Sequence, residues 1–340
     1  MKQYVYLFPI LLLLTSGCNN RTLSQTEINR VNKQWSRSSN IGIRFSGTFI
    51  ALTNRTRSLS AAKWNLALDD CKENGMQWLI LADTTSNTET AIRHIMDYAE
   101  ANGLKVFMGV LDNKEWQAIH AARGRAGLDE IADEFIANAK KRWGLYSEYK
   151  CFYGWYDYPE FYSFPLIVAK DVNYYYKKVS AALNEISPGK KHTISPHPPK
   201  IGYSPFWWKK EWSVALKDSG VDIVFWQDGF GARDSGTPAD VLPYWRVMYN
   251  VCQESDIKLW GNIETFMRID NAFVPSNVQR LANQFEIALP FCEEFITWEY
   301  MYYCNPVYGV EGSGAFNVAY ERDFIEKRWF PTYLESIDGS

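Results

Sequence analysis

From residue 41 onward, short apolar runs alternate with longer stretches in which apolar residues recur every three or four positions. The runs are rich in β-branched and aromatic residues and are followed by polar turn residues, a pattern typical of buried strands. The longer stretches have the spacing of amphipathic helices. The runs cover 41–52, 76–84, 105–112, 151–161, 191–199, 221–232, 257–266 and 295–303. The helical stretches include 61–74, 88–102, 128–143, 171–186, 239–254 and 276–289, with Ser60, Asp171, Asp240 and Ser276 as expected capping residues.

Strands that alternate with helices predict a parallel sheet. Eight such units match a (β/α)8 TIM barrel, so we predict an α/β fold with one domain over residues 41–340. The alternative is a doubly wound open sheet, which would carry a glycine-rich turn after its first strand. The first run offers only the single Gly47 in "FSGTF", and the count of units favours the barrel.

The N-terminus has the pattern of a lipoprotein signal peptide over residues 1–18. Lys2 is followed by an apolar run and then by "TSGC", in which Cys18 is the expected lipidation site. Thr15 stands where a lipobox usually has an aliphatic residue, and the alternatives are a plain secretory signal or an uncleaved anchor. Residues 19–40 are polar and lack apolar periodicity, which predicts a tether. We therefore expect a membrane-anchored lipoprotein of the bacterial cell envelope, either periplasmic or surface-exposed.

Composition narrows the possible partners. The chain is 46% apolar and 22% charged, as in soluble globular proteins, and its net charge of -3 argues against nucleic acid as a partner. Aromatic residues make up 16% of the chain, including 14 Trp and 21 Tyr, and flat rings suit sugar stacking as well as core packing. The cysteines other than Cys18 are scattered without a CxxC pair, which indicates small buried residues rather than zinc ligands or a disulfide framework.

Carboxylates cluster at the ends of the predicted strands, where TIM barrels form their active sites. These residues are Asp83, Asp112, Asp157, Glu160, Asp228, Glu264 and Glu299. Several carboxylates on one rim would repel one another and raise each other's pKa, so such a set indicates chemistry or cation binding.

Two classes of chemistry use such a rim. Glycoside hydrolysis needs a proton donor and a second carboxylate on the other side of the scissile bond. Metal-assisted hydrolysis needs His beside the acids, and of the four His only His197 in "SPHPP" lies at a strand end. We therefore expect neither a metal nor another cofactor, and we expect His197 to hydrogen-bond to substrate or backbone.

Glu160 and Glu264 are the candidate catalytic pair, on the fourth and seventh runs. Glu160 follows Pro159, which should end the strand, and Glu264 lies near the end of an apolar run, where burial of an unused carboxylate is costly. The alternative for each is a structural ion pair with Lys or Arg. Asp157 is a candidate for orienting substrate hydroxyls or raising the pKa of Glu160, with ordinary loop hydrogen bonding as the alternative.

Further positions suit substrate binding. Gln227 and Asp228 are candidates for hydrogen bonds to sugar hydroxyls, although Asp228 also suits a tight turn before Gly229. Glu299 is a candidate for holding hydroxyls or tuning pKa values. Trp155, Trp226, Trp260 and Trp298 recur at similar depth in four runs, either to fill the barrel or to stack on sugar rings.

The chain resembles a bacterial family of glycoside-hydrolase-like barrel proteins of unknown function. The resemblance rests on "GTF" (47–49), "GLKVFMGV" (103–110), "YGWYDYPEF" (153–161), "ISP" (194–196), "QDGFGA" (227–232) and "WGNIETF" (260–266). It implies a TIM barrel, a carbohydrate-active role, acids at Glu160 and Glu264, and the pair Gln227 and Asp228. The "DYP" stretch departs from the family pattern, so Asp157 is particular to this chain. A more distant likeness to retaining glycosidases departs at Pro159, where those enzymes commonly have Asn.

The sequence thus predicts a lipid-anchored glycoside hydrolase that acts on a poly- or oligosaccharide through Glu160 as general acid/base and Glu264 as nucleophile or base. The alternatives are a carbohydrate-binding envelope lipoprotein that has lost catalysis and a metal-dependent hydrolase that uses His197. A carboxylate locked in an ion pair with Arg would favour the binding protein. The sugar, its linkage and the stereochemical outcome are not specified by the sequence.

Overall fold

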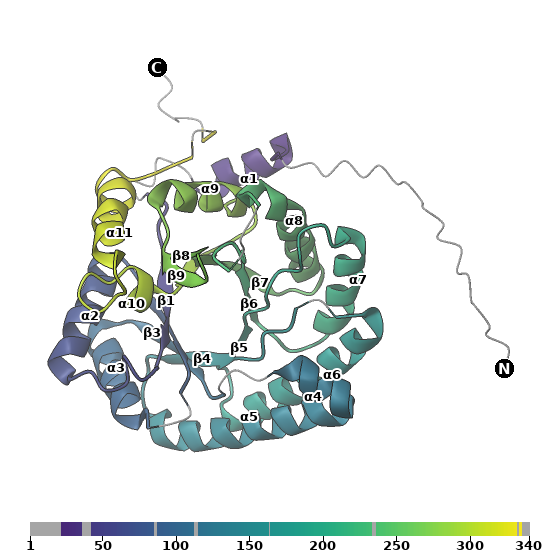
Figure 1. Cartoon of the computed structure of the whole chain (residues 1–340). Helices are drawn as coiled ribbons and strands as arrows, with labels where there is room; N and C mark the ends of the chain where they lie inside the picture. Colours follow the sequence, from purple (N-terminus) through teal and green to yellow (C-terminus); the bar gives the residue numbers. More distant parts are fainter. Residues whose placement is uncertain are drawn as a thin grey trace, which may run out of the picture.

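The computed structural model describes residues 22–35, 42–84, 87–111, 115–162, 164–232, 236–331 and 333–334. These residues form a closed barrel of eight parallel strands in the order β1-β10-β7-β6-β5-β4-β3-β2 (Figure 1). The barrel strands are β1 (Gly47–Ala51), β2 (Trp78–Ala82), β3 (Lys105–Gly109), β4 (Phe152–Asp157), β5 (Lys191–Ile194), β6 (Ile223–Gln227), β7 (Lys258–Glu264) and β10 (Phe295–Trp298). The predicted TIM barrel is confirmed.

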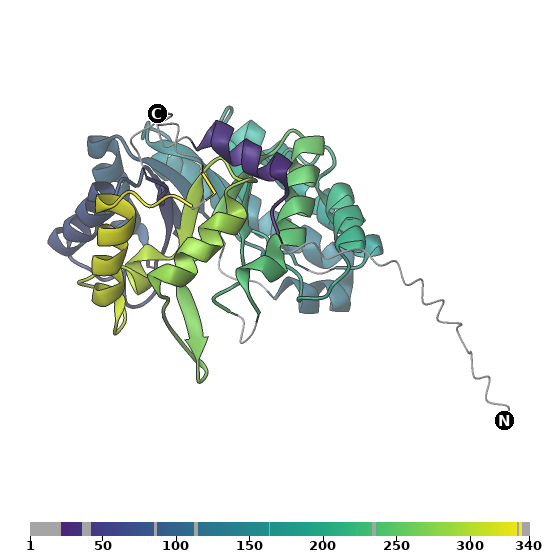
Figure 2. The same cartoon turned by 90° about the horizontal axis from the view of Figure 1, so that it is seen from above.

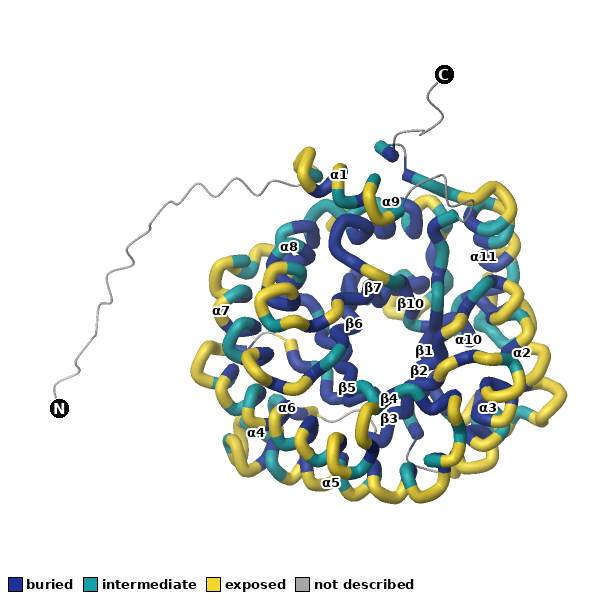
Figure 3. Tube along the Cα trace, turned by 180° about the vertical axis from the view of Figure 1, so that it is seen from behind, coloured by how far each residue is buried: buried dark blue, intermediate teal, exposed yellow. Residues whose placement is uncertain are grey.

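Helices surround the barrel with their apolar sides inward, so that buried strands lie inside a ring whose outer surface is exposed (Figure 3). The helices are α2 (Ala61–Glu73), α3 (Glu89–Asn102), α4 (Trp116–Arg123), α5 (Arg125–Tyr146), α6 (Leu166–Ile186), α7 (Pro205–Leu216), α8 (Pro238–Glu254), α9 (Val278–Ala288), α10 (Tyr300–Tyr303) and α11 (Ser313–Tyr320), followed by a π-helical turn at Glu321–Glu326. Among the described residues, no helix is long and apolar enough to cross a membrane.

Local capping explains where several helices begin. Ser60 accepts a hydrogen bond from the Lys63 amide, as predicted. The cap of α8 is Thr237 and not the predicted Asp240, whose side chain instead accepts from the Thr237 amide as the third residue of the helix. The cap of α9 is Asn277, one residue beyond the predicted Ser276. The prediction for Asp171 is wrong, because α6 begins earlier, after Pro165, and Asp171 instead pairs with Arg125 from within the helix.

The segment predicted to be a polar tether, 19–40, contains the helix α1 (Gln25–Gln34), which packs beside α8 and α9 (Figure 1). Glu27 and Val31 lie one helical turn apart and are both buried. The Glu27 carboxylate accepts from Arg246 Nε at 2.6 Å and Nη2 at 2.7 Å, which fixes the helix to α8. One buried helical turn is therefore enough to hold α1 against the barrel. The segment has too few apolar residues for a helical spacing to be recognised in the sequence. Residues 1–21, including Cys18, lie outside the described part of the chain.

A short hairpin extends the chain beyond β7. Its strands β8 (Phe266–Ile269) and β9 (Ala272–Pro275) pair antiparallel and project away from the barrel (Figure 2). The seventh apolar run was predicted to end at residue 266, so the hairpin was not foreseen. Asp270 and Asn271 turn it with positive φ values of 46° and 66°, a conformation that Asp and Asn tolerate better than most residues.

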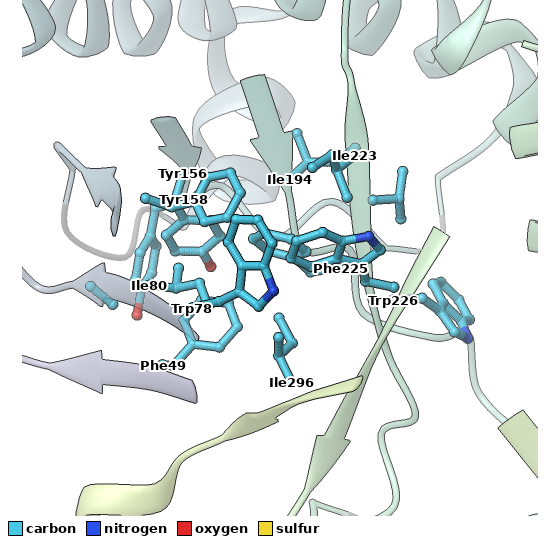
Figure 4. Packing of buried hydrophobic residues seen from close by; sticks show 14 of the residues in the cluster. Phe49, Trp78, Ile80, Tyr156, Tyr158, Ile194, Ile223, Phe225, Trp226 and Ile296 are labelled. Atoms are coloured by element: carbon cyan, nitrogen blue, oxygen red, sulfur yellow. The ribbon is translucent and has the colours of Figure 1, made fainter. Parts of the chain in front are cut away.

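Aromatic rings fill the interior of the barrel. Phe49, Tyr156 and Phe225 lie together there (Figure 4), with Phe49 and Tyr156 at a centroid distance of 5.0 Å. Trp298 also packs against Phe49 at 5.0 Å, and Phe107 packs against Phe225 at 5.3 Å. Because these rings close the barrel axis, a site at the C-terminal ends of the strands has an apolar floor.

Candidate active site

Glu160 lies on the same inward-facing side of the chain as alternate residues at the end of β4. Tyr156 and Tyr158 lie among the interior rings (Figure 4), and Glu160 follows two positions later at the C-terminal mouth of the barrel. Its Oε1 accepts a hydrogen bond of 2.9 Å from Gln227 Nε2, and the same amide nitrogen donates to the Ser195 carbonyl at 2.9 Å. Glu160 is therefore held at the mouth by residues from β6 and the end of β5.

The environment of Glu160 favours its protonated form. Burial raises the pKa of this carboxyl to about 7, the nearby Asp83 carboxylate adds to the rise, and the Gln227 hydrogen bond opposes it. A carboxyl with a pKa near neutral pH is suited to proton donation and to proton acceptance in the same reaction cycle.

Glu264 ends β7 and also faces the interior. Trp260 and Asn262 precede it on the same face, and Trp298 of β10 lies beside it in the strand register. Its Oε2 accepts hydrogen bonds from the Gly231 amide and from the Ala232 amide, the latter at 3.2 Å. The loop after β6 thus binds one oxygen of this carboxylate through two backbone donors.

Gly231 allows that contact through its lack of a side chain. A Cβ built at this position would lie 2.6 Å from the Phe266 carbonyl oxygen and from its ring. Any larger residue would push the loop away from β8 and shift its amides relative to Glu264. The pKa of Glu264 is raised to about 8 by burial and by Asp228, whereas the two amides and the charge of Arg280 lower it.

Asp228 lies on the other face of the strand ends and has structural partners. Its Oδ2 accepts from Gln284 Nε2 at 2.5 Å, and its Oδ1 accepts from the Phe230 amide at 3.2 Å. Only 2% of the residue is exposed. The alternative of a turn in which Asp228 bonds its own backbone is the one observed, and contact of Asp228 with sugar hydroxyls stays a prediction.

Neither candidate catalytic carboxylate is locked in an ion pair. Within the described part of the chain, Glu160 and Glu264 form no salt bridge of 4.0 Å or less, and no group of three His, Cys, Asp or Glu side chains could hold a metal ion. The five cysteines after Cys18 are free and buried, as predicted. Among the described residues, no cation therefore fixes either carboxyl in its ionised form, and each can give up or take a proton.

Glu299 is buried at the junction of β1 and β10. Its Oε2 accepts from the Ala51 amide at 2.7 Å, and its Oε1 is buried without a hydrogen-bond partner among the described residues. Burial raises the pKa of Glu299 to about 8, and Asp83 adds to the rise. Asp83 thus raises the pKa of both Glu160 and Glu299. Asp112 lies outside the described residues.

Two predicted binding residues of β4 point away from the mouth. Trp155 is fully buried against Trp143 of α5, and its Nε1 donates to Ser187 Oγ at 2.7 Å. Asp157 accepts from Tyr175 of α6 at 2.8 Å and contacts His192 Nε2 at 3.2 Å. Both side chains fill the layer between strand and helices and so lie away from the candidate catalytic carboxylates.

The tryptophans of β6 and β7 differ in direction, and only that of β7 fills the barrel, one of the two predicted alternatives. Trp226 points outward, away from the interior rings (Figure 4), and packs against Trp208 and Trp245 of the helical layer. Trp260 lies inside the barrel but toward its N-terminal end, where it lines a hollow of about 650 Å³ with Trp78 and Lys105. Of the four predicted rings, only the half-buried Trp298 lies beside a candidate catalytic residue.

His197 lies next to Glu160. Both residues line a hollow of about 460 Å³ outside the barrel mouth, together with Tyr162 and Tyr203. The Nδ1 of His197 donates to the Pro198 carbonyl at 2.8 Å. The position fits the predicted strand-end role, with the backbone as one of its partners.

The structure adds residues that the sequence pattern did not single out. Ser195 and Asn262 form a polar layer inside the barrel, with Asn262 Nδ2 donating to Ser195 Oγ at 3.2 Å. Arg280 and Gln284 reach the β6–β7 end from α9. The spacing of Arg280 and Gln284 could have indicated that they act together, because residues four apart on a helix share one face.

Known structures share the fold. A candidate alpha-L-fucosidase from Bacteroides thetaiotaomicron VPI-5482 superposes with a TM-score of 0.68 at 19% identity, covering 83% of this chain and 94% of that one. A hyperthermostable endo-1,4-beta-D-mannanase from Thermotoga petrophila RKU-1 gives 0.53 at 11% identity, covering 76% and 88%. At such identities the likeness extends to the fold alone.

Sequence comparison identifies a family. No protein with a curated description matches this chain. The family model DUF4434, a domain of unknown function, matches residues 45–308, which include β1 to β10 and both candidate carboxylates. The chain therefore belongs to the DUF4434 family.

Proposed function

We propose that this protein is a glycoside hydrolase that uses Glu160 and Glu264 as its two catalytic carboxylates. The observation that carries the proposal is a pair of inward-facing carboxyls at the C-terminal mouth of a TIM barrel, both with a raised pKa and neither in a salt bridge among the described residues. The glycosidase fold of the structural neighbours supports this reading.

In the proposed reaction, Glu160 gives its proton to the oxygen of the leaving group as the glycosidic bond breaks. Glu264 acts as the carboxylate on the other side, either by attacking the anomeric carbon or by taking a proton from the attacking water. We assign the ionised role to Glu264 because the amides of Gly231 and Ala232 donate to its Oε2. Its pKa of about 8 lies above the pKa of about 7 of Glu160, so the form with Glu160 protonated and Glu264 ionised is the less populated of the two singly protonated forms. The net reaction adds one water and yields a free sugar and an alcohol.

Paired substitutions test these roles. Glu160→Gln and Glu264→Gln keep the shape of each side chain but remove its proton chemistry, so each should lower kcat by at least about a hundredfold. Circular dichroism and thermal unfolding should show both variants folded. Hydrolysis at the wild-type rate by either variant would remove that residue from its role. Glycan binding without hydrolysis by the wild type would favour the non-catalytic binding protein.

We further propose that Cys18 carries a lipid that anchors the protein to the bacterial cell envelope. The motif "TSGC" after an apolar run supports this proposal. Metabolic labelling with a palmitate analogue should mark the full-length protein, and Cys18→Ala should abolish the label. Labelling of Cys18→Ala at the wild-type level would contradict the anchor.

A further inference from the structure

The hollow beside Glu160 has walls with few hydrogen-bonding groups. It measures about 460 Å³ and is lined by Glu160, Tyr162, His197, Pro198, Pro199 and Tyr203, with Lys200 at its edge. Both tyrosine hydroxyls bond elsewhere, that of Tyr162 to Gln117 and that of Tyr203 to Glu211 at 2.6 Å. The two hydroxyls are therefore already engaged, and the two residues offer mainly apolar ring atoms to the hollow.

The backbone of this wall is also poor in donors. Pro198 and Pro199 have no N–H, and the Pro198 carbonyl already accepts from His197 Nδ1. A sugar unit placed here would lose hydrogen bonds to water that this wall does not replace, whereas an apolar group would lose none. The chemistry of the wall thus favours an apolar occupant.

A second hollow continues the same surface. It measures about 380 Å³, shares Tyr203 with the first, and is lined by Phe164, Pro165, Leu166, Trp207 and Glu211. Leu166 and Trp207 are 38% and 49% exposed, although both are large apolar residues. They lie at the starts of α6 and α7, which neighbour each other around the barrel (Figure 1). The two hollows form an apolar track that leads from Glu160 toward solvent.

We propose that this track is the leaving-group subsite and that it takes an apolar aglycone, an alkyl or aryl group, rather than a further sugar. The inference rests on the proposed function, in which Glu160 protonates the leaving-group oxygen, because the group that departs must then lie on the Glu160 side. The aglycone packs between the faces of Tyr162 and Tyr203 and extends toward Trp207.

Binding can be measured without turnover. Saturation-transfer NMR of 4-nitrophenol with the wild-type protein should show saturation of the aryl protons. Tyr162→Ala and Trp207→Ala should each reduce it at least threefold. Tyr174→Ala is the matched control, since Tyr174 is as exposed as Tyr162, at 39%, but lies on α6 outside both hollows, and it should leave the signal unchanged. No saturation at millimolar 4-nitrophenol, or equal losses in all three variants, would overturn the proposal.

Turnover separates this proposal from the function on which it rests. Octyl and methyl glycosides of the same sugar have leaving groups of similar basicity, so kcat/KM should favour the octyl compound at least tenfold through apolar burial alone. Trp207→Ala should bring the ratio toward one. Equal kcat/KM values for the two compounds in the wild type would overturn the apolar subsite and leave the hydrolase standing. Absence of turnover on every glycoside, with aryl binding intact, would contradict the hydrolase instead.

Discussion

At the scale of single residues, the proposed hydrolysis depends on two carboxyls that titrate near neutral pH. The pKa values of about 7 for Glu160 and about 8 for Glu264 arise mainly from burial. Hydrolysis needs Glu160 protonated and Glu264 ionised, which is the less populated singly protonated form because the pKa of Glu160 is the lower of the two. Below pH 7 both carboxyls carry a proton and above pH 8 neither does, so the active form is confined to a narrow pH range.

We therefore predict a bell-shaped pH dependence of kcat/KM with limbs near pH 7 and pH 8 and a maximum between them. Steady-state kinetics from pH 5 to 10 on any confirmed substrate would measure it. A flat profile between pH 5 and 7 would show that no carboxyl with a raised pKa takes part.

Gln227 influences the acidic limb of this pH profile. Its amide stabilises the ionised form of Glu160 through a 2.9 Å hydrogen bond. Gln227→Met has a similar length but no donor, so it should raise the pKa of Glu160 and move the acidic limb up by about one pH unit. An unmoved limb, in a variant that folds and turns over substrate, would mean that this hydrogen bond does not control the titrating group.

At the scale of elements, the loop after β6 positions Glu264. Gly231→Ala should displace that loop from Phe266 and weaken the two amide contacts, lowering kcat about tenfold to a hundredfold. Gly144→Ala is the matched control, because a Cβ at this position of α5 meets nothing within 4 Å. Equal kcat values for Gly231→Ala and the wild type would show that the loop amides do not support Glu264.

The elements that could be predicted from the sequence are those with a local cause. The apolar period marked the barrel strands, and Pro159 marked the point where the chain leaves β4 and Glu160 reaches the mouth. The direction of each side chain was harder to predict. Trp155 and Trp226 look equivalent to interior rings in the sequence, but strand alternation turns them toward the helices, and a bulge in the pairing of β3 with β4 shifts that alternation.

Contacts between distant elements account for the rest. Asp228 could not be recognised as structural, because its partner Gln284 lies 56 residues away on α9. The same holds for α1, whose docking depends on Arg246 in α8. Such pairings follow from the closure of the barrel and not from any short stretch of sequence.

At the scale of the whole molecule, the buried acids at the mouth reduce stability as the pH rises. Glu299 has a pKa of about 8 when folded against an ordinary value of 4.5, so the folded state binds more protons between these values. Its contribution is complete below pH 4.5 and is lost as the pH rises to about 8. The loss at pH 8 is on the order of 4 kcal/mol.

Urea unfolding at pH 5 and pH 8 should show a lower free energy of unfolding at pH 8 for the wild type. Glu299→Gln does not titrate and should make the difference smaller. An unchanged difference in Glu299→Gln would show that Glu299 does not hold its proton in the folded protein at these pH values.

We propose that the barrel mouth hydrolyses a glycosidic bond through Glu160 and Glu264. The most direct measurement is the release of reducing sugar by the purified protein from a panel of poly- and oligosaccharides and alkyl and aryl glycosides at pH 7.5. We predict release from at least one compound by the wild type and loss of that release in both Glu160→Gln and Glu264→Gln. Release that persists in both variants, or none from any compound, would contradict it.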